Sequence, residues 1–212
     1  MISEDDIKGR GVYAPEVLDF VKSANDYCIW LEEQKESGSM KFIRDGVVVL
    51  SRVYYRAVSL NDAEPMLEGG NEKFVTEQDW SAIYQKVLNL LGSHNSYLRI
   101  AEDDEFDRTD LVSHNISEDL ADIYQDLKDF TLQYRQGIEE IMNDAIWEVT
   151  DNFDHYWGEK LLNALQALNR LYTKKVDPEA GDEMPYTEEE DDGPSYDNSF
   201  FTRLQDLNEE EI

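Results

Sequence analysis

Apolar residues near the N-terminus recur at steps of three and four positions, which is the spacing of one face of an α-helix. After Pro15 they stand at Val17, Val21, Ala24, Cys28 and Leu31. A proline suits the first turn of a helix, where no backbone hydrogen bond is lost. The Ser37-Gly38-Ser39 run then supplies a stop. The pattern predicts an amphipathic helix that begins at Pro15 and ends before this run.

Two interpretations compete for the next segment. The pair Asp45-Gly46 beside a run of valines is a hairpin signal. The helical spacing nevertheless continues over fifteen residues, at Ile43, Val47, Leu50, Tyr54 and Ala57. A period sustained that long favours a helix from about 40 to 60. Within that helix Gly46 is a weak point that costs up to ~1 kcal/mol of helix propensity.

Two further stripes have clear beginnings. Thr76 and Asp79 resemble an N-terminal cap, and the helix after them closes at Gly92. Its stripe consists of Trp80, Ile83, Val87 and Leu90. Asn115 and Glu118 make a cap-like start for the clearest helix of the chain. That helix carries Ile116, Leu120, Ile123, Leu127, Phe130 and Tyr134.

The remaining apolar pattern runs from Ile138 to Tyr172. As one straight helix it would be roughly 52 Å long, against about 30 Å for its neighbours. We therefore expect a break or kink near Asp151-Asn152 or Trp157-Gly158. The polar and acidic residues 93–115 predict a loop or one irregular turn.

Composition changes sharply at the C-terminus. Residues 177–212 hold fourteen acidic residues and one basic residue, Arg203. Prolines and glycines recur there, so we expect a largely disordered acidic tail. One short amphipathic helix is predicted within it at 199–208, where the apolar residues Phe200, Phe201, Leu204 and Leu207 cluster.

These patterns together predict an all-α protein. A short N-terminal segment, residues 1–14, precedes a single helical bundle at 15–176. The bundle has about five helices, of which the last is broken or kinked. The acidic tail at 177–212 follows it.

The charge balance limits the partners. Nineteen Lys and Arg face 48 Asp and Glu, a formal net charge of -29. Such a surface repels nucleic acid and anionic membranes, so we expect neither as a partner. Cys28 is the single cysteine, which fits a reducing compartment. The N-terminus lacks the pattern of a signal peptide and no apolar run is long enough to span a membrane, so the cytoplasm is the predicted location.

One stretch carries a family resemblance. The segment Asp119-Leu-Ala-Asp-Ile-Tyr-Gln-Asp-Leu-Lys128, with Tyr27-Cys28 and Trp157-Gly158 in other helices, resembles a bacterial family described as domain of unknown function 5063. The likeness covers about residues 14–173. It implies a helical, cytoplasmic, bacterial protein and carries over no activity. Histidines commonly flank the Trp-Gly pair in that family, whereas this chain has Tyr156 and Lys160 there.

Asp119, Asp122 and Asp126 are the main candidate for chemistry. At positions i, i+3 and i+7 they project from one side of a helix, and we call them the acidic ridge. Such a ridge can hold Mg²⁺ while substrate phosphates complete its coordination. Alternatively, the ridge is solvated or pairs with Arg52 and Arg56, one turn apart on another helix. A ridge that is solvated or paired with these arginines is preferred over a metal site, so no cofactor is expected.

Other candidates are weaker. The Arg pair itself could bind a phosphate or carboxylate ligand, although pairing with acidic neighbours at a helix interface is the preferred interpretation. Trp157 is expected in the core, or at an interface if it is exposed. Cys28 lies on an apolar face and is expected to be an inert buried thiol. The histidines His94, His114 and His155 are not at metal-ligand spacing.

No catalytic motif stands out, so the chemistry of the protein is not determined by its sequence. The preferred hypothesis is a non-enzymatic interaction or adaptor protein with a protein partner. The tail residues Phe200, Phe201, Leu204 and Leu207 are candidates for docking on that partner or on the bundle itself. A Mg²⁺- or Mn²⁺-dependent phosphohydrolase that uses the acidic ridge is the first alternative. A mimic of nucleic acid is the second, and the oligomeric state stays open.

Overall fold

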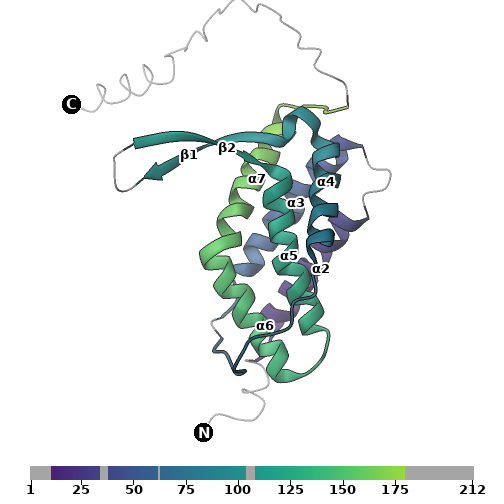
Figure 1. Cartoon of the computed structure of the whole chain (residues 1–212). Coiled ribbons are helices and arrows are strands. Elements are labelled where there is room, and N and C mark those ends of the chain that lie inside the picture. The colour runs from purple at the N-terminus through teal and green to yellow at the C-terminus, as the bar shows by residue number, and fades with distance from the viewer. Residues whose placement is uncertain (1–10, 34–37, 62, 104–107, 180–212) are drawn as a thin grey trace, which may run out of the picture. The chain divides into compact units, whose positions relative to one another are not determined.

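A computed structural model describes residues 11–33, 38–61, 63–103 and 108–179, and for 100–103 and 108–110 it describes the backbone alone. The helices form one bundle (Figure 1). They are α2 (Pro15–Glu32), α3 (Ser39–Ala57), α4 (Glu77–Leu91), α5 (Ile116–Tyr134), α6 (Glu139–Asn152) and α7 (Gly158–Thr173). The shorter elements are η1 (Gly92–Asn95), η2 (Phe153–Trp157), β1 (Ser96–Asp103) and β2 (Arg108–Asn115). The all-α bundle of about five helices is confirmed, counting α6, η2 and α7 as one broken helix.

The tail beyond residue 179 lies outside the described residues, and with it the docking candidates Phe200, Phe201, Leu204 and Leu207. None of the helices in the described part of the chain combines the length and the apolar character needed to cross a bilayer.

Helix α5 is the centre of the bundle. It contacts α2, α4, α6 and α7, and its stripe residues Leu120, Ile123 and Leu127 are fully buried. The hydroxyl of Tyr27 on α2 donates a hydrogen bond to the Leu120 carbonyl at 2.8 Å. This bond satisfies the buried phenol in the core, which is the usual requirement for a buried tyrosine.

Gly46 allows α3 to approach its neighbours. A Cβ at this position would lie 2.8 Å from the Trp30 ring and 2.9 Å from the Leu168 side chain. The helix at Ser39–Ala57 is confirmed, but Gly46 is buried inside it. What looked like a weak point for the isolated helix is therefore a point of close packing of α3 against α2 and α7.

The apolar pattern from Ile138 to Tyr172 is interrupted at Phe153–Trp157, close to where the sequence predicted a break. Between α6 and α7 the backbone forms a π-helical turn, η2, and the Gly158 N–H donates to the Phe153 carbonyl. A side chain at Gly158 would collide with that same carbonyl. Trp157 is fully buried beside it and donates from Nε1 to the Val149 carbonyl at 3.1 Å. The structure thus explains the Trp-Gly pair. The Trp157 indole anchors the π-helical turn, and Gly158 leaves room for the Phe153 carbonyl.

The prediction of a loop at 93–115 is wrong. After η1, strands β1 and β2 pair antiparallel in a hairpin with Tyr97 opposite His114, and the two rings stack with centroids 5.8 Å apart. The hairpin projects sideways from one end of the bundle (Figure 1). Each face of its strands mixes apolar and polar residues, so the sequence lacks the alternation that identifies a half-buried strand.

The start of α5 was predicted correctly, but its capping residue was not. Asn115 stands at the N-cap and makes no side-chain cap bond. Instead Asn95 from η1 accepts a hydrogen bond from the Ser117 N–H at 2.9 Å and donates one to the Ser117 hydroxyl at 2.9 Å. The cap is supplied by a residue twenty-two positions away, and it fixes the base of the hairpin on the helix.

Candidate functional site

The acidic ridge of α5 faces other protein elements rather than solvent. The Asp119 side chain is 3% exposed and that of Asp122 is 13% exposed. The two lie beside η2, α7 and the base of the hairpin. Their surroundings therefore decide what these carboxylates can do.

Asp122 is the most heavily bonded of the three. It accepts hydrogen bonds from the indole of Trp80 on α4 at 2.8 Å and from the hydroxyl of Tyr156 on η2 at 2.9 Å. The ammonium of Lys160 on α7 lies 2.8 Å away, and 5.0 Å from the centre of the Tyr156 ring. Three donors from three elements thus converge on the Asp122 carboxylate. They leave its oxygens little capacity to accept hydrogen bonds from a ligand or to bind a metal ion.

Asp119 accepts a hydrogen bond from the Tyr97 hydroxyl of β1 at 2.5 Å. Lys160 lies 3.9 Å from its other oxygen. Burial raises the pKa of the Asp119 carboxyl to about 6, although the Tyr97 hydrogen bond and the Lys160 charge both lower it. The loss of hydration on burial thus raises the pKa of Asp119 by more than its two partners lower it.

Asp126 has a separate environment. It accepts a hydrogen bond from the Asn152 amide at 2.6 Å. Burial raises the pKa of its carboxyl to about 6, against the lowering effect of Asn152. The three ridge carboxylates are therefore divided between different partners and do not converge on one point.

No metal site emerges from this arrangement. Among the described residues, no group of three or more His, Cys, Asp or Glu side chains is placed to hold an ion. A hard cation needs several carboxylate or carbonyl oxygens directed at one centre. Here the ridge oxygens are directed at Trp80, Tyr97, Asn152, Tyr156 and Lys160 instead.

The ridge does not pair with the two arginines, which was one of the two interpretations left open for it. Arg52 pairs with Asp26 at 3.0 Å, and Arg56 pairs with Asp19 at 2.8 Å. Both acidic partners lie on α2, so the arginines join α2 to α3. This confirms the preferred interpretation that they satisfy acidic neighbours at a helix interface. The cation that does reach the ridge, Lys160, was not predicted.

The other candidates have structural roles. Cys28 is buried, and burial raises the pKa of its thiol to about 12. His155 Nδ1 lies 2.8 Å from the Asp151 carbonyl, which is a local contact one helical turn apart. Trp157 is in the core, as expected.

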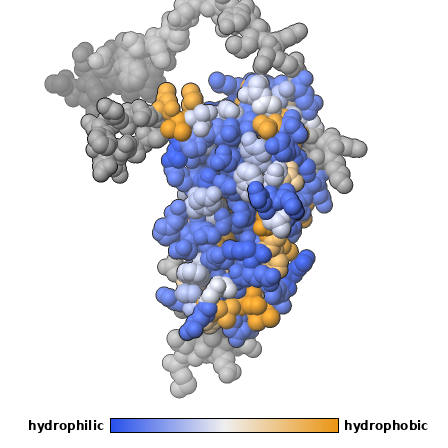
Figure 2. Space-filling model, viewed as in Figure 1, coloured by the Kyte–Doolittle hydropathy of each residue, from blue (hydrophilic) through white to orange (hydrophobic). Residues whose placement is uncertain are grey.

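The hairpin arm presents a surface that sequence reasoning missed. Cross-strand partners share a face, so Leu98, Leu111 and Ser113 lie together, and we call them the outer face. Leu98 is 61% exposed and Leu111 is 68% exposed. Figure 2 shows apolar side chains gathered where the hairpin leaves the bundle.

Residues of the opposite face tie the arm to the bundle. Tyr97 contacts Asp119, and Arg99 forms an ion pair with Glu159 on α7. Tyr97 and Arg99 thus anchor one face of the arm to the bundle, while Leu98 and Leu111 on the other face are exposed. A sequence signal existed in the mixed Tyr, Leu and Ile content of residues 96–101, but the acidic residues that follow obscured it.

Known proteins resemble this chain over most of its length. The family model described as domain of unknown function 5063 matches residues 12–174. The chain belongs to this family. It is also similar to the crystal structure of protein BF1032 from Bacteroides fragilis, with 31% identity and a TM-score of 0.67, over 76% of this chain and 94% of that one. None of the curated proteins matches.

In this member of the family, the two most informative motifs meet in space. The segment Asp119–Lys128 lies on α5, and the residues that flank Trp157-Gly158 are Tyr156 and Lys160. Both flanking residues bind Asp122. The structure thus joins the two resemblance motifs through one carboxylate, and the contact secures α5 to α7.

Proposed function

We propose that this family member is a protein-binding adaptor, and that the outer face of the hairpin docks a basic segment of its partner. The observation that carries the proposal is the exposure of Leu98 and Leu111, at 61% and 68%, on an arm that projects from the bundle. Exposed apolar residues gathered on one element are typical of protein interfaces.

The negative charge of the chain indicates that the partner segment is basic. The chain has a formal net charge of -29. An acidic partner would meet repulsion, whereas a segment rich in lysine or arginine would be steered towards the arm. A second copy of the chain, which carries the same charge, is disfavoured for the same reason.

The alternatives gain less support. A metal-dependent phosphohydrolase would need open carboxylates, but the ridge oxygens accept hydrogen bonds and ion pairs from the protein itself. A nucleic-acid mimic would need carboxylates spaced like phosphates on the surface, and the patterned carboxylates of the bundle are mostly buried.

Affinity capture with the full chain tests the adaptor proposal. The double variant Leu98→Asp/Leu111→Asp is compared with Leu162→Asp, which changes an exposed leucine of α7. We expect the double variant alone to lose a basic partner, and capture of that partner by the wild type to weaken as salt rises. Equal retention by both variants would overturn the proposal. Circular dichroism verifies that each variant is folded.

A further inference from the structure

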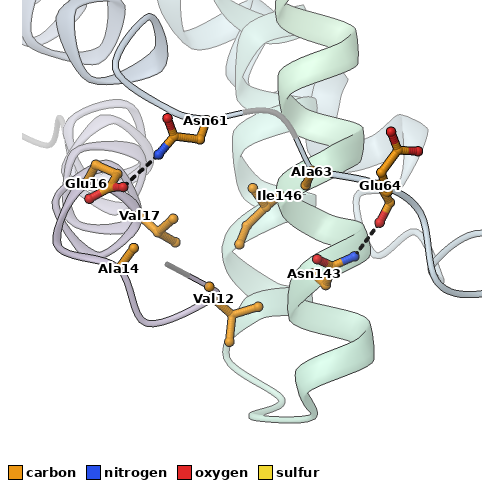
Figure 3. A pocket seen from close by; sticks show the side chains of 10 residues that line it. Val12, Ala14, Glu16, Val17, Asn61, Ala63, Glu64, Asn143 and Ile146 are labelled. Atoms are coloured by element: carbon orange, nitrogen blue, oxygen red, sulfur yellow. Dashed lines mark hydrogen bonds between the residues drawn. The ribbon is translucent and has the colours of Figure 1, made fainter. Parts of the chain in front are cut away.

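A separate pocket lies at the opposite end of the bundle from the hairpin. Its volume is about 790 Å³, and Figure 3 shows it between the start of α2, the loop after α3 and one side of α6. The apolar part of its wall includes Ala14, Val17 and Ile146, all buried, and the half-buried Val12. The Val12 carbonyl accepts a hydrogen bond from the Tyr134 hydroxyl at 2.5 Å, which holds that wall in place.

The two side-chain amides of the pocket each donate a hydrogen bond to the protein. The Asn61 amide donates to the Glu16 carboxylate at 2.8 Å. The Asn143 amide donates to the Glu64 carbonyl at 2.7 Å. Among the described residues, the side-chain oxygens of both amides and the second carboxylate oxygen of Glu16 remain as acceptors.

The charged residues that line this pocket are acidic. Glu16 and Glu64 are acidic, and none of the described residues that line the pocket carries a positive charge. An anionic ligand would find no cation among these described lining residues and would be repelled by Glu16 and Glu64. A ligand that brings its own donors and a positive charge would complement the acceptors, and a short alkyl stem would cover the apolar wall.

We propose that this pocket binds a primary ammonium group on a short alkyl stem. The ammonium bonds to Glu16 and to the side-chain oxygen of Asn61 or Asn143, and the stem packs against Val17 and Ile146. The ammonium can belong to a free alkyl diamine or to a lysine side chain of a peptide. The proposal does not depend on the hairpin, because the two sites share no residue.

Calorimetric titration of the full chain at about 150 mM salt, where unspecific attraction is screened, tests the assignment. The probes are 1,4-diaminobutane, lysine blocked at both its backbone ends, and neutral 1,4-butanediol. We expect saturable one-site binding of an ammonium probe and none of the diol. Preference for the diamine assigns a free amine, and preference for the blocked lysine assigns a peptide.

Two charge-matched variants separate the pocket from the general acidity of the protein. Glu16→Gln keeps the acceptor for Asn61 but removes the charge, and Glu77→Gln removes an exposed charge on α4, away from the pocket lining. Ammonium affinity is expected to fall at least tenfold in the first variant and to stay within twofold in the second. Equal affinities in both, or equal binding of the diol, would overturn the assignment.

Discussion

The Lys160 ammonium of α7 lies 2.8 Å from the Asp122 carboxylate of α5. The same carboxylate also receives Trp80 and Tyr156. It therefore connects α4, α5, η2 and α7 through one residue. Its removal should affect the whole bundle rather than one contact.

Replacing Asp122 should destabilise the fold. Asp122→Ala leaves an indole N–H, a phenol and a partly buried ammonium without their acceptor, so we expect the free energy of unfolding to fall by about 2–4 kcal/mol. Urea denaturation followed by tryptophan fluorescence measures this. Asp154→Ala, at an exposed position of η2, should change it by less than about 0.5 kcal/mol. A loss equal in both variants would contradict the role given to Asp122.

Adding one methyl group at Gly46 should also destabilise the protein. Alanine is the better helix former by about 1 kcal/mol, but its Cβ would meet the Trp30 ring at 2.8 Å and Leu168 at 2.9 Å. We expect overpacking to prevail, with a net loss of about 1–2 kcal/mol. Ser51→Ala, at an exposed position of the same helix, should be neutral or slightly stabilising. A more stable Gly46→Ala protein would show that this contact relaxes freely.

The capping arrangement predicts an unusual ranking of two asparagines. Asn95→Ala removes the acceptor of the Ser117 N–H, so we expect a loss of about 1–2 kcal/mol and faster amide hydrogen exchange in β1 and β2. Asn115→Ala should cost less than about 0.5 kcal/mol, since Asn115 makes no cap bond. A larger loss of stability in Asn115→Ala than in Asn95→Ala would show that the N-cap residue itself caps α5.

Stability should increase on mild acidification. Burial raises the pKa of both Asp119 and Asp126 from the ordinary value of 3.8 to about 6. The native state thus holds protons that the unfolded chain has released between these values. The resulting stabilisation is complete below pH 3.8 and is lost as pH rises through 6. We expect Tm to be higher at pH 5.5 than at pH 7.5 by roughly 2–6 °C.

A neutral variant isolates this effect from the general repulsion of a protein with many negative charges. Asp126→Asn keeps the acceptor for Asn152 but cannot ionise, so its Tm should depend less on pH than that of the wild type. Asp154→Asn removes one exposed charge and serves as the reference. Identical pH slopes for all three proteins would assign the acid stabilisation to net charge alone.

Local patterns in the sequence determined the helices well. The stripe at Leu120, Ile123 and Leu127 specifies a helix because its period is set by backbone geometry within a few residues. The same holds for the cap at Thr76 and Asp79, which forms a reciprocal pair in the structure, and for Gly92, which ends α4 with a positive φ of 52°. These signals need no knowledge of distant parts of the chain.

Tertiary structure decided which side chains contact the acidic ridge. The spacing of Asp119, Asp122 and Asp126 indicated a shared face of a helix, but only the packing of α4, α7 and the hairpin brought Trp80, Lys160 and Tyr97 to it. The hairpin itself was missed because its stability comes from cross-strand and anchoring contacts, which no short window contains. The periodicity of a helix is a local property, whereas burial, capping at a distance and the pairing of charges depend on which elements meet in space.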